Sequence, residues 1–552
     1  MTIDESKFNP ESTIRSVFEE AGVTISSFEQ RSFPDETIYV VKVLDEDFSR
    51  ASEIGNELDF KLQKAGVKGF VTVRKADSNA QKSGKQMASG VNDPKASELI
   101  SLLNARSRAS ELQPSLSYIP DTAFNIKTIT AHRHHLIFGR RGVGKTALMV
   151  EAKRLVTEDG HVAVWGNLQT LRRESVSRAY CLISQGICNA IQVHFNGKSI
   201  SPKVLSQIID LNDELSRILL QDEVSDQTLG RLIPRLQIVI RRFVETASCH
   251  LYLFIDELHY FDRDKQPLLL DALHGSVRDC NAWLKIAGIR HLSRWFKPHP
   301  PIGLQTGHDA DDIDLDITLE SPSKAKEFLE KILGSYARNA GISGLSGLII
   351  NDALDRLVLA SGAVPRDYLV LCGGAIRQAQ RRDRARLIGV QDINKAAGDA
   401  AKAKLIELED DTSGTTTAQD LLANLKLIRA FCLDERKFTF FRIEFKDKET
   451  HPDEYRVIQD LMDLRLVHLI DASLSDPNEA GNRSEVYMLD LSQFSGQRLK
   501  KNLKAIDFSG GHLVLKETGT TTVAKIGATP TQRIGILRRG PIFPLNRLSD
   551  VK

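Results

Sequence analysis

The sequence contains no apolar run that approaches the length of a membrane-spanning helix, which needs about 20 consecutive apolar residues. Its first residues include acidic side chains and lack the apolar core that follows a basic start in a secretory signal. The first absence excludes a protein embedded in a membrane, and the second removes the usual signal for export. We therefore expect a cytoplasmic protein.

Cysteine is also scarce, with 6 residues in a chain of 552. The cysteines are scattered, with no C-x-x-C pair and no histidine at zinc-finger spacing, so we expect reduced core residues. Neither sign of charge dominates, because the formal net charge is +2. A balance this close to zero neither indicates nor excludes nucleic-acid binding, which depends on how the charges are distributed along the chain.

The chain is too long for one compact core, and a length of about 150 residues per domain predicts three or four domains. Residues 1–76 show the pattern of a small α/β accessory domain. Its expected helices and extended segments lie near 11–21, 23–30, 37–44, 47–65 and 69–75. Residues 77–94 are polar, contain glycine and serine and have little to bury, which is typical of a flexible linker.

Between residues 95 and 320, short apolar runs alternate with helical patterns, which predicts a parallel sheet covered on both faces. The runs are His134–Phe138, His161–Trp165, Leu251–Ile255 and Leu284–Ile289. Residues 321–410 show helical periodicity and predict a helical lid that follows this α/β core. Its expected helices are 321–338, 347–361, 365–381 and 391–408.

Residues 415–494 show the element order of a winged helix-turn-helix. The expected elements are helices over 418–433, near 440–446 and over 452–464, and strands near 466–470 and 485–491. Residues 495–552 form a C-terminal extension with short extended candidates at His512–Lys516 and Arg533–Leu537.

A phosphate-binding motif, Gly139-x-x-x-x-Gly144-Lys145-Thr146, lies between a predicted strand and a predicted helix. Glycines let backbone N–H groups surround phosphates, and the helix directs its positive end at them. We expect Lys145 to reach the β- and γ-phosphates of ATP and Thr146 to be a ligand of Mg²⁺. The expected nucleotide-binding residues are Gly139, Arg140, Arg141, Gly142, Val143, Gly144, Lys145, Thr146 and Ala147.

A second motif, Leu251-Tyr-Leu-Phe-Ile-Asp-Glu257, is an apolar strand that ends in two acids. In a parallel sheet such an end lies beside the phosphate loop, so Asp256 is the expected second residue of the Mg²⁺ site. Glu257 is then the expected base that orients the attacking water. The alternative is that an apolar strand ends in acids because they meet solvent. The two motifs together predict a P-loop ATPase.

The two motifs, the strand Leu284–Arg290 and the segment Ser361–Asp367 resemble the AAA+ and STAND group of P-loop ATPases. The resemblance is strongest to the origin-recognition and replication-initiator-like branch and runs from about Tyr118 to Phe494. It implies a P-loop parallel sheet with a helical lid and a C-terminal winged helix, next to the small N-terminal α/β domain.

The same resemblance assigns roles to single arginines. It implies that Arg290 senses the γ-phosphate at the end of the fourth strand and that Arg366 reaches the nucleotide from the lid. The chain has no Asn or Thr where AAA+ members often carry one at that strand end, which favours the STAND side. By position, Arg294 is the candidate for a trans-acting arginine of a ring, with an ordinary surface arginine as the alternative. Tyr118-Ile-Pro120 is either an adenine-packing segment or a hydrophobic turn.

Charge separates two candidate DNA contacts. The expected recognition helix carries Asp453, Glu454, Asp460 and Asp463 against Arg456 and Arg465. This net negative charge weakens binding to phosphates, and a protein-docking or autoinhibitory role is an equal alternative to DNA binding. The C-terminal extension is basic, with Arg498, Lys500, Lys501, Lys504, Lys516, Lys525, Arg533, Arg538, Arg539, Arg547 and Lys552 against three acids. It is the candidate for DNA contact, with a solvated extension as the alternative.

Two further patterns suggest metals and are better explained otherwise. Adjacent residues of His132-Arg-His-His135 point to opposite faces of a strand, and no carboxylate or cysteine follows at ligand spacing. The acidic run Asp309–Thr318 lacks the glycine and closing glutamate of a calcium loop and alternates with Ile and Leu, as a half-buried strand does.

The leading hypothesis is an ATP-hydrolysing molecular switch that acts on DNA or on a partner protein, in replication, transposition or antiviral phage defence. The alternative is an ATP-gated scaffold with little turnover that docks partners through its N-terminal and winged-helix domains. Homo-oligomer formation is open in both cases.

Overall fold

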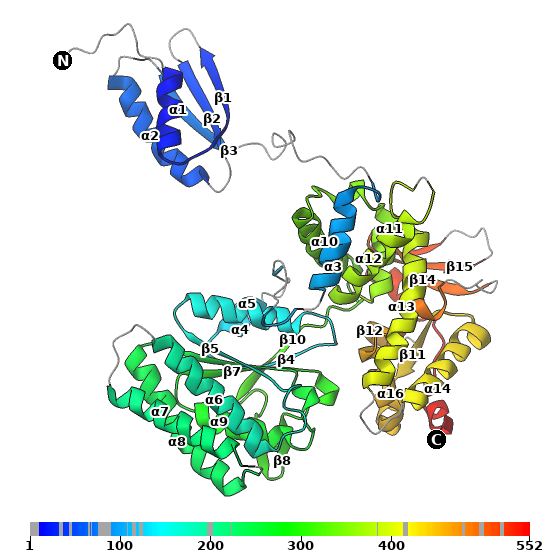
Figure 1. Cartoon of the computed structure of the whole chain (residues 1–552). Helices are drawn as coiled ribbons and strands as arrows, with labels where there is room; N and C mark the ends of the chain where they lie inside the picture. The colour runs from blue at the N-terminus through cyan, green and yellow to red at the C-terminus, as the bar shows by residue number, and fades with distance from the viewer. Residues whose placement is uncertain are drawn as a thin grey trace. The chain divides into compact units, whose positions relative to one another are not determined.

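Figure 1 shows the computed structural model of the chain, which divides into two compact units, residues 1–87 and residues 88–552. Each unit is described by itself. The structure describes residues 10–32, 37–43, 47–64, 67, 69–75, 90–107, 109–112, 118–120, 125–195, 202–221, 223–383, 385–411, 418–476, 481–495, 502–518 and 524–551. Most of the predicted linker 77–94 lies outside these ranges.

The N-terminal unit packs helices against a three-stranded sheet. Its elements are α1 (Pro10–Glu20), β1 (Ile25–Ser32), β2 (Thr37–Val43), α2 (Phe48–Lys64) and β3 (Gly69–Lys75). Strand β2 is central, pairing antiparallel with β1 and parallel with β3. On α2, Ala51, Leu58 and Leu62 are buried at helical spacing against this sheet. The elements closely follow those expected from the sequence.

The second unit contains a five-stranded parallel sheet in the order β10-β4-β7-β6-β5. Its strands are β4 (His134–Phe138), β5 (Val162–Asn167), β6 (Leu251–Asp256), β7 (Ala282–Gly288) and β10 (Ala310–Asp314). The strands predicted from their apolar runs are therefore present and form one sheet, and the acidic run is a strand only as far as Asp314. Helices separate β4, β5, β6 and β7 in the sequence, as the connections of parallel strands require.

Helices cover both faces of this sheet, which is why its strands, apart from the acidic edge strand β10, are almost continuously apolar. Alternate residues of β4 point to opposite faces: Leu136 and Phe138 pack with α6 and α9, whereas Ile137 packs with α4 and α5 (Figure 1). The covering helices are α4 (Asn125–Thr130), α5 (Lys145–Glu158), α6 (Val176–Phe195), α7 (Pro202–Leu219), α8 (Asp226–Ala247) and α9 (Gln266–Val277). A short hairpin follows, formed by β8 (Phe296–Pro298) and β9 (Pro301–Gly303).

The helical lid contains α10 (Pro322–Asn339), α11 (Asn351–Ser361), α12 (Pro365–Gln380) and α13 (Val390–Asp411). Helix α3 (Pro94–Arg106) joins it, although its place in the sequence precedes the sheet: Leu99 and Leu103 are buried in the same core as α10 and α12. The described end of the predicted linker is also packed there. Val91 is buried, and its N–H donates to Arg386 O at 2.8 Å.

The segment after the lid forms a three-stranded sheet, β11-β13-β12, with helices beside it. Its elements are α14 (Ala418–Arg429), the π-helical turn η6 (Ala430–Arg436), β11 (Phe440–Glu444), α15 (Phe445–Thr450), α16 (Pro452–Asp463), β12 (Val467–Ser475) and β13 (Arg483–Leu489). The prediction of a helix near 440–446 was wrong. Phe440 and Phe441 are buried and pair in register with β13, so β11 depends on a partner distant in sequence. The winged-helix identity stays a prediction.

The C-terminal extension is folded in its described residues. It contains β14 (Lys504–Ser509), β15 (His512–Glu517), β16 (Lys525–Gly527) and α17 (Pro530–Leu537). The prediction that Arg533–Leu537 is extended was wrong, because Thr529 and Gln532 form a capping box that starts a helix there. The buried Phe543 ring packs against Phe431 at 5.1 Å and Phe441 at 5.7 Å, which joins the extension to the preceding segment.

Among the described helices, none combines the length and the apolar character needed to cross a bilayer.

Candidate nucleotide-binding site

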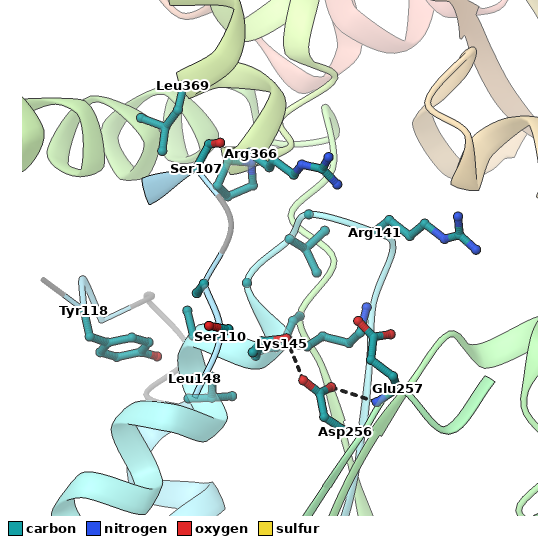
Figure 2. Close-up of a pocket in the computed structure, with 18 of the residues that line it drawn as sticks. Ser107, Ser110, Tyr118, Arg141, Lys145, Leu148, Asp256, Glu257, Arg366 and Leu369 are labelled. Atoms are coloured by element: carbon teal, nitrogen blue, oxygen red, sulfur yellow. Dashed lines mark hydrogen bonds between the residues drawn. The ribbon is translucent and has the colours of Figure 1, made fainter. Parts of the chain in front are cut away.

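A pocket of about 640 Å³ lies where the phosphate loop, the carboxyl ends of β5 and β6, and the lid meet (Figure 2). The loop contributes a continuous run of lining residues, from Arg141 to Leu148. Asp256 and Glu257 come from the end of β6, and Arg366 and Leu369 come from α12. Sheet and lid therefore supply opposite walls of one cavity, large enough for a nucleotide-sized ligand.

The backbone of the phosphate loop requires glycine at two positions in particular. Gly144 has φ +109° immediately before α5, and Gly142 has φ +84°. A Cβ on Gly142 would also lie 2.9 Å from Cβ of Arg366, so a larger residue would push the lid away from the loop. The loop thus leaves its N–H groups unobstructed at the start of a helix, where anions bind.

Lys145 lies inside the loop. Its Nζ donates to the carbonyl oxygens of Gly139 at 2.7 Å and Arg140 at 3.1 Å. Burial lowers the pKa of Lys145, and the carboxylates of Glu257 and Asp256 oppose that shift. A buried cation held by two carbonyl dipoles is available to an incoming anion, because phosphate oxygens are stronger hydrogen-bond acceptors than carbonyls.

The two sequence motifs meet in one hydrogen bond. Oγ1 of Thr146 donates to Oδ2 of Asp256 at 2.8 Å, and the other carboxylate oxygen accepts the Glu257 N–H at 2.9 Å (Figure 2). Burial raises the pKa of Asp256 and of Glu257, and the neighbouring Asp256 charge raises that of Glu257 further. A hydroxyl beside a buried carboxylate is a donor set that fits Mg²⁺, whose charge would compensate these acids.

Glu257 has a strained backbone, with φ +62°, at the start of the 3₁₀ turn Leu258–Tyr260 (η3). This conformation directs its side chain into the pocket, where it lies beside Lys145 (Figure 2). His259, which sequence reasoning missed, also lines the pocket, with Nε2 3.4 Å from the Glu257 carboxylate. Burial lowers the pKa of His259 well below its usual value, so the ring is neutral and the contact is not an ion pair.

The lid contacts the loop directly through Arg366, whose backbone N–H donates to Gly142 O at 3.2 Å. Arg366 also lines the pocket.

Arg140, expected among the nucleotide-binding residues, is buried and has a different environment. Its guanidinium donates to Asp316 at 3.1 Å, to Ile317 O at 3.1 Å and to Gly362 O at 3.4 Å. Arg140 therefore joins the loop to the segment after β10 and to the lid, and neither Arg140 nor Gly139 is a lining residue.

The structure does not bring Arg290 to the pocket lining. Its guanidinium donates to Asp312 at 2.9 Å and lies over the Phe138 ring at 4.2 Å from the centroid. Arg294 pairs with the exposed Asp264 at 3.0 Å, also on the protein surface.

An apolar wall completes the pocket on the side away from the acids. The segment Tyr118-Ile-Pro120 was expected either to pack on adenine or to form a hydrophobic turn. Two of its residues, Tyr118 and Ile119, line the pocket. Further apolar lining residues are Leu315, Ile317, Phe328, Ile332, Tyr336 and Leu369. They come from β10's exit and from the lid, so sequence reasoning about the loop alone had no signal for them. Such a surface is suited to a flat aromatic base.

A third element reaches the edge of this site. His291, next to Arg290, has Nε2 3.3 Å from Asp460 and 3.2 Å from Asp463, both on α16. Burial raises the pKa of Asp463 to about 6, and the positive charges of His291, Arg141 and Lys145 limit that rise. The acidic helix therefore docks on the ATPase core. Its negative charge, noted in the sequence as unfavourable for DNA, has a partner within the chain.

Comparison with known proteins identifies the central domain. Residues 123–281 match the family model of the AAA ATPase domain. Among curated proteins no match is found. Three solved structures share low sequence identity. The Orc1 protein of Aeropyrum pernix in complex with DNA is 15% identical, covers 68% of this chain and 90% of its own, and has a TM-score of 0.34.

A RuvB variant of Thermotoga maritima is 14% identical, covers 61% of this chain and 75% of its own, and has a TM-score of 0.27. The Drosophila origin recognition complex bound to DNA is 11% identical, covers 65% of this chain and 87% of its own, and has a TM-score of 0.28. Scores at this level add nothing to what the strand order and the phosphate loop already establish.

Proposed function

Because this chain carries an AAA+ P-loop ATPase domain, we propose that it binds and hydrolyses ATP and uses the cycle as a molecular switch. The observation that carries the proposal is the 2.8 Å hydrogen bond between Thr146 and Asp256 beside the buried Lys145. Two motifs 110 residues apart in the sequence converge there on one pocket. The alternative, a glycine-rich turn with a surface lysine, does not explain why the loop contacts a buried acidic strand end.

In this proposal the phosphates enter the loop and Lys145 exchanges its two carbonyl acceptors for phosphate oxygens. Arg366, at the start of α12, contacts the phosphates from the lid. Thr146 and Asp256 would hold Mg²⁺, which neutralises charge that develops on the phosphates. The Tyr118 side of the pocket receives the base.

Glu257 is the proposed base that orients the attacking water. Its carboxylate lies beside Lys145, and the raised pKa of this carboxyl favours acceptance of a proton near neutral pH. The side chain of His259 is neutral and buried next to it, which keeps the local environment poorly solvated. A water between the γ-phosphate and Glu257 would thus be activated in a site of low dielectric constant.

The switch follows from the contacts between loop and lid. Two hydrogen bonds join the phosphate loop to the lid beside the pocket. The Arg366 N–H donates to Gly142 O, and the Arg140 guanidinium donates to Gly362 O. A change at the γ-phosphate would therefore alter the position of the lid, as in other two-state nucleotide switches. The contact of His291 with Asp463 would transmit the same change to the segment after the lid.

The output of the switch is a partner protein or DNA, with replication, transposition and phage defence as candidate settings. In this chain several basic residues of the extension have intramolecular acidic partners. These pairs are Lys516 with Asp507, Arg533 with Asp471, and Arg547 with Glu435. The pairing and the docked acidic helix favour a protein partner over DNA as the output of the switch.

Steady-state ATP hydrolysis, with and without DNA, tests the proposal on wild type, Glu257→Gln and the control Glu158→Gln. Glu158 is an exposed residue of α5 that pairs with Arg154. We expect turnover to fall by about 100-fold or more in Glu257→Gln while ATP still binds, because loss of a general base costs that much. The control should match wild type. If wild type binds ATP tightly but shows no turnover under any condition, the proposal of ATP hydrolysis is overturned. The ATP-gated scaffold would then be the remaining hypothesis.

A further inference from the structure

Three histidines meet at the edge of the central sheet opposite to the nucleotide pocket. His161 and His250 directly precede β5 and β6, and His132 lies just before β4. One ring nitrogen from each lies within 4.8 Å of the other two. Strands of this length place the cluster about 15–20 Å from the phosphate loop at their carboxyl ends, so it is separate from the Mg²⁺ site.

Aromatic contacts hold these rings together. The centroids of His132 and His250 are 4.0 Å apart at an interplanar angle of 31°, and those of His161 and His250 are 4.8 Å apart at 86°. The Trp283 ring of β7 lies nearly parallel to that of His132 at 5.9 Å. The cluster therefore spans segments from four neighbouring strands.

The backbone on both sides of His132 is fixed by a buried lysine. Nζ of Lys285 donates to Ala131 O at 2.7 Å and to Arg133 O at 2.8 Å, the two carbonyls that flank His132. Lys285 is fully buried, and burial lowers its pKa well below the usual value. The side chain of His132 is exposed, so a ligand can reach its ring from solvent while Lys285 holds the backbone on both sides.

The ring nitrogens have few competing partners. Nδ1 of His250 is buried and has no hydrogen-bond partner among the residues that the structure describes. An unsatisfied buried nitrogen of this kind calls for an explanation such as a bound ion. Nδ1 of His161 accepts only a long bond, 3.3 Å, from the His250 N–H.

The other histidines at this edge are occupied. Nδ1 of His134 accepts the Leu284 N–H at 3.0 Å, and Nδ1 of His135 lies 2.9 Å from Nζ of Lys285. Within the run 132–135, the Nδ1 atoms of His134 and His135 are therefore engaged with other groups. His132 instead combines with two histidines that are distant in sequence.

We propose that His132, His161 and His250 form a binding site for a divalent transition metal, with Zn²⁺ as the preferred ion. Three imidazoles without a thiolate suit Zn²⁺, and water completes a tetrahedral shell. Ligand nitrogens around Zn²⁺ lie about 3.3 Å apart, so the rings must close up, with the exposed His132 moving most. A metal on Nδ1 of His161 replaces its long hydrogen bond. The bound ion ties together the starts of β4, β5 and β6 and stabilises the sheet.

The test uses tag-free full-length protein, stripped with a chelator and kept free of nucleotide and Mg²⁺. Zn²⁺ is added in the presence of a chromophoric competitor, which gives affinity and stoichiometry, and thermal unfolding is followed with and without Zn²⁺. Co²⁺ then serves as a spectroscopic probe, because its visible absorption reports tetrahedral nitrogen ligands. The variants are His132→Ala, a surface change that should not affect folding, and the control His512→Ala, an exposed histidine on β15.

We expect one equivalent of Zn²⁺ on wild type, a Zn²⁺-dependent rise in Tm, and affinity lower by roughly 10-fold or more in His132→Ala. The control should behave as wild type. Substoichiometric binding to wild type, equal affinity in His132→Ala, or an octahedral Co²⁺ spectrum would each overturn the proposal. Because no nucleotide is present, the result does not depend on whether the chain hydrolyses ATP.

Discussion

The two edges of the central sheet present different chemistry built from the same strands. The carboxyl edge carries a buried lysine, a threonine hydroxyl and two acids around one pocket. The amino edge carries histidines around a fixed loop. At the carboxyl edge the start of a helix favours anions, and the acids at the strand ends favour cations. At the amino edge no such backbone field exists, so any ligand must be held by side chains alone.

The same comparison explains how far each edge is coupled to the rest of the chain. The carboxyl edge contacts the lid through Arg366 and contacts α16 through His291. The histidine cluster contacts only elements of the sheet domain among the described residues. A ligand at the first edge can therefore change the arrangement of domains, whereas one at the second can change only the stability of the sheet.

The largest expected effect separates the two edges. Lys145→Ala should weaken ATP binding by roughly 100-fold, because at least two charge-assisted hydrogen bonds to phosphate are lost. Calorimetric titration with ATP measures this, and the exposed Lys265→Ala is the matched control. The Zn²⁺-dependent rise in Tm should persist in Lys145→Ala. If that rise disappears as well, the two edges are not independent and the comparison fails.

The next effect distinguishes two arginines near the carboxyl edge. Arg366→Ala should weaken ATP binding by roughly 10-fold or more, since it removes a cationic side chain from the pocket lining. Arg290→Ala should change ATP affinity by less than about twofold, because its guanidinium is engaged with Asp312 and Phe138 on the surface. Fluorescence titration with a labelled ATP analogue compares them. The opposite ranking would show that Arg290 moves to the γ-phosphate when nucleotide binds.

The smallest effect concerns the contact between the carboxyl edge and α16. Burial raises the pKa of Asp463 to about 6, above its unfolded value of about 3.9. The folded protein thus holds this proton more tightly, and the stability gained from it is present at low pH and is lost as pH rises from about 4 to 6. Above pH 6 the folded state must bury a carboxylate.

Asp463→Asn removes this titration. Between pH 5 and pH 7.5 the free energy of unfolding of wild type should fall relative to that of the variant by about 1–2 kcal/mol. Denaturant unfolding at both pH values measures the difference, with the exposed Asp453→Asn on the same helix as control. A wild type that instead gains stability relative to Asp463→Asn as pH rises would mean that the ion pair with His291 outweighs the cost of burial.

Local sequence patterns predicted most of the fold and the centre of the pocket. The apolar runs of β4, β6 and β7 bury both faces, so their sequence pattern identifies them as strands without knowledge of their partners. The wrong predictions mainly concern segments whose structure depends on contacts with residues distant in the sequence. Phe440–Glu444 is a strand because β13 pairs with it, and α3 belongs with the lid because its buried leucines fit there. The helix that contains Arg533 depends on a cap which the apolar pattern does not reveal.

The sequence by itself determined the phosphate loop and the acidic strand end, because contiguous residues with fixed backbone geometry carry that chemistry. Only the tertiary structure decided which distant side chains join them: Arg366 at the pocket, Arg290 turned toward Asp312, and Asp463 against His291. The histidine cluster is the extreme case. Its members lie 29 and 89 residues apart, from His132 to His161 and from His161 to His250, and strand order alone brings them together. The spacing of residues in a sequence predicts such a site only when all of its ligands belong to one local element.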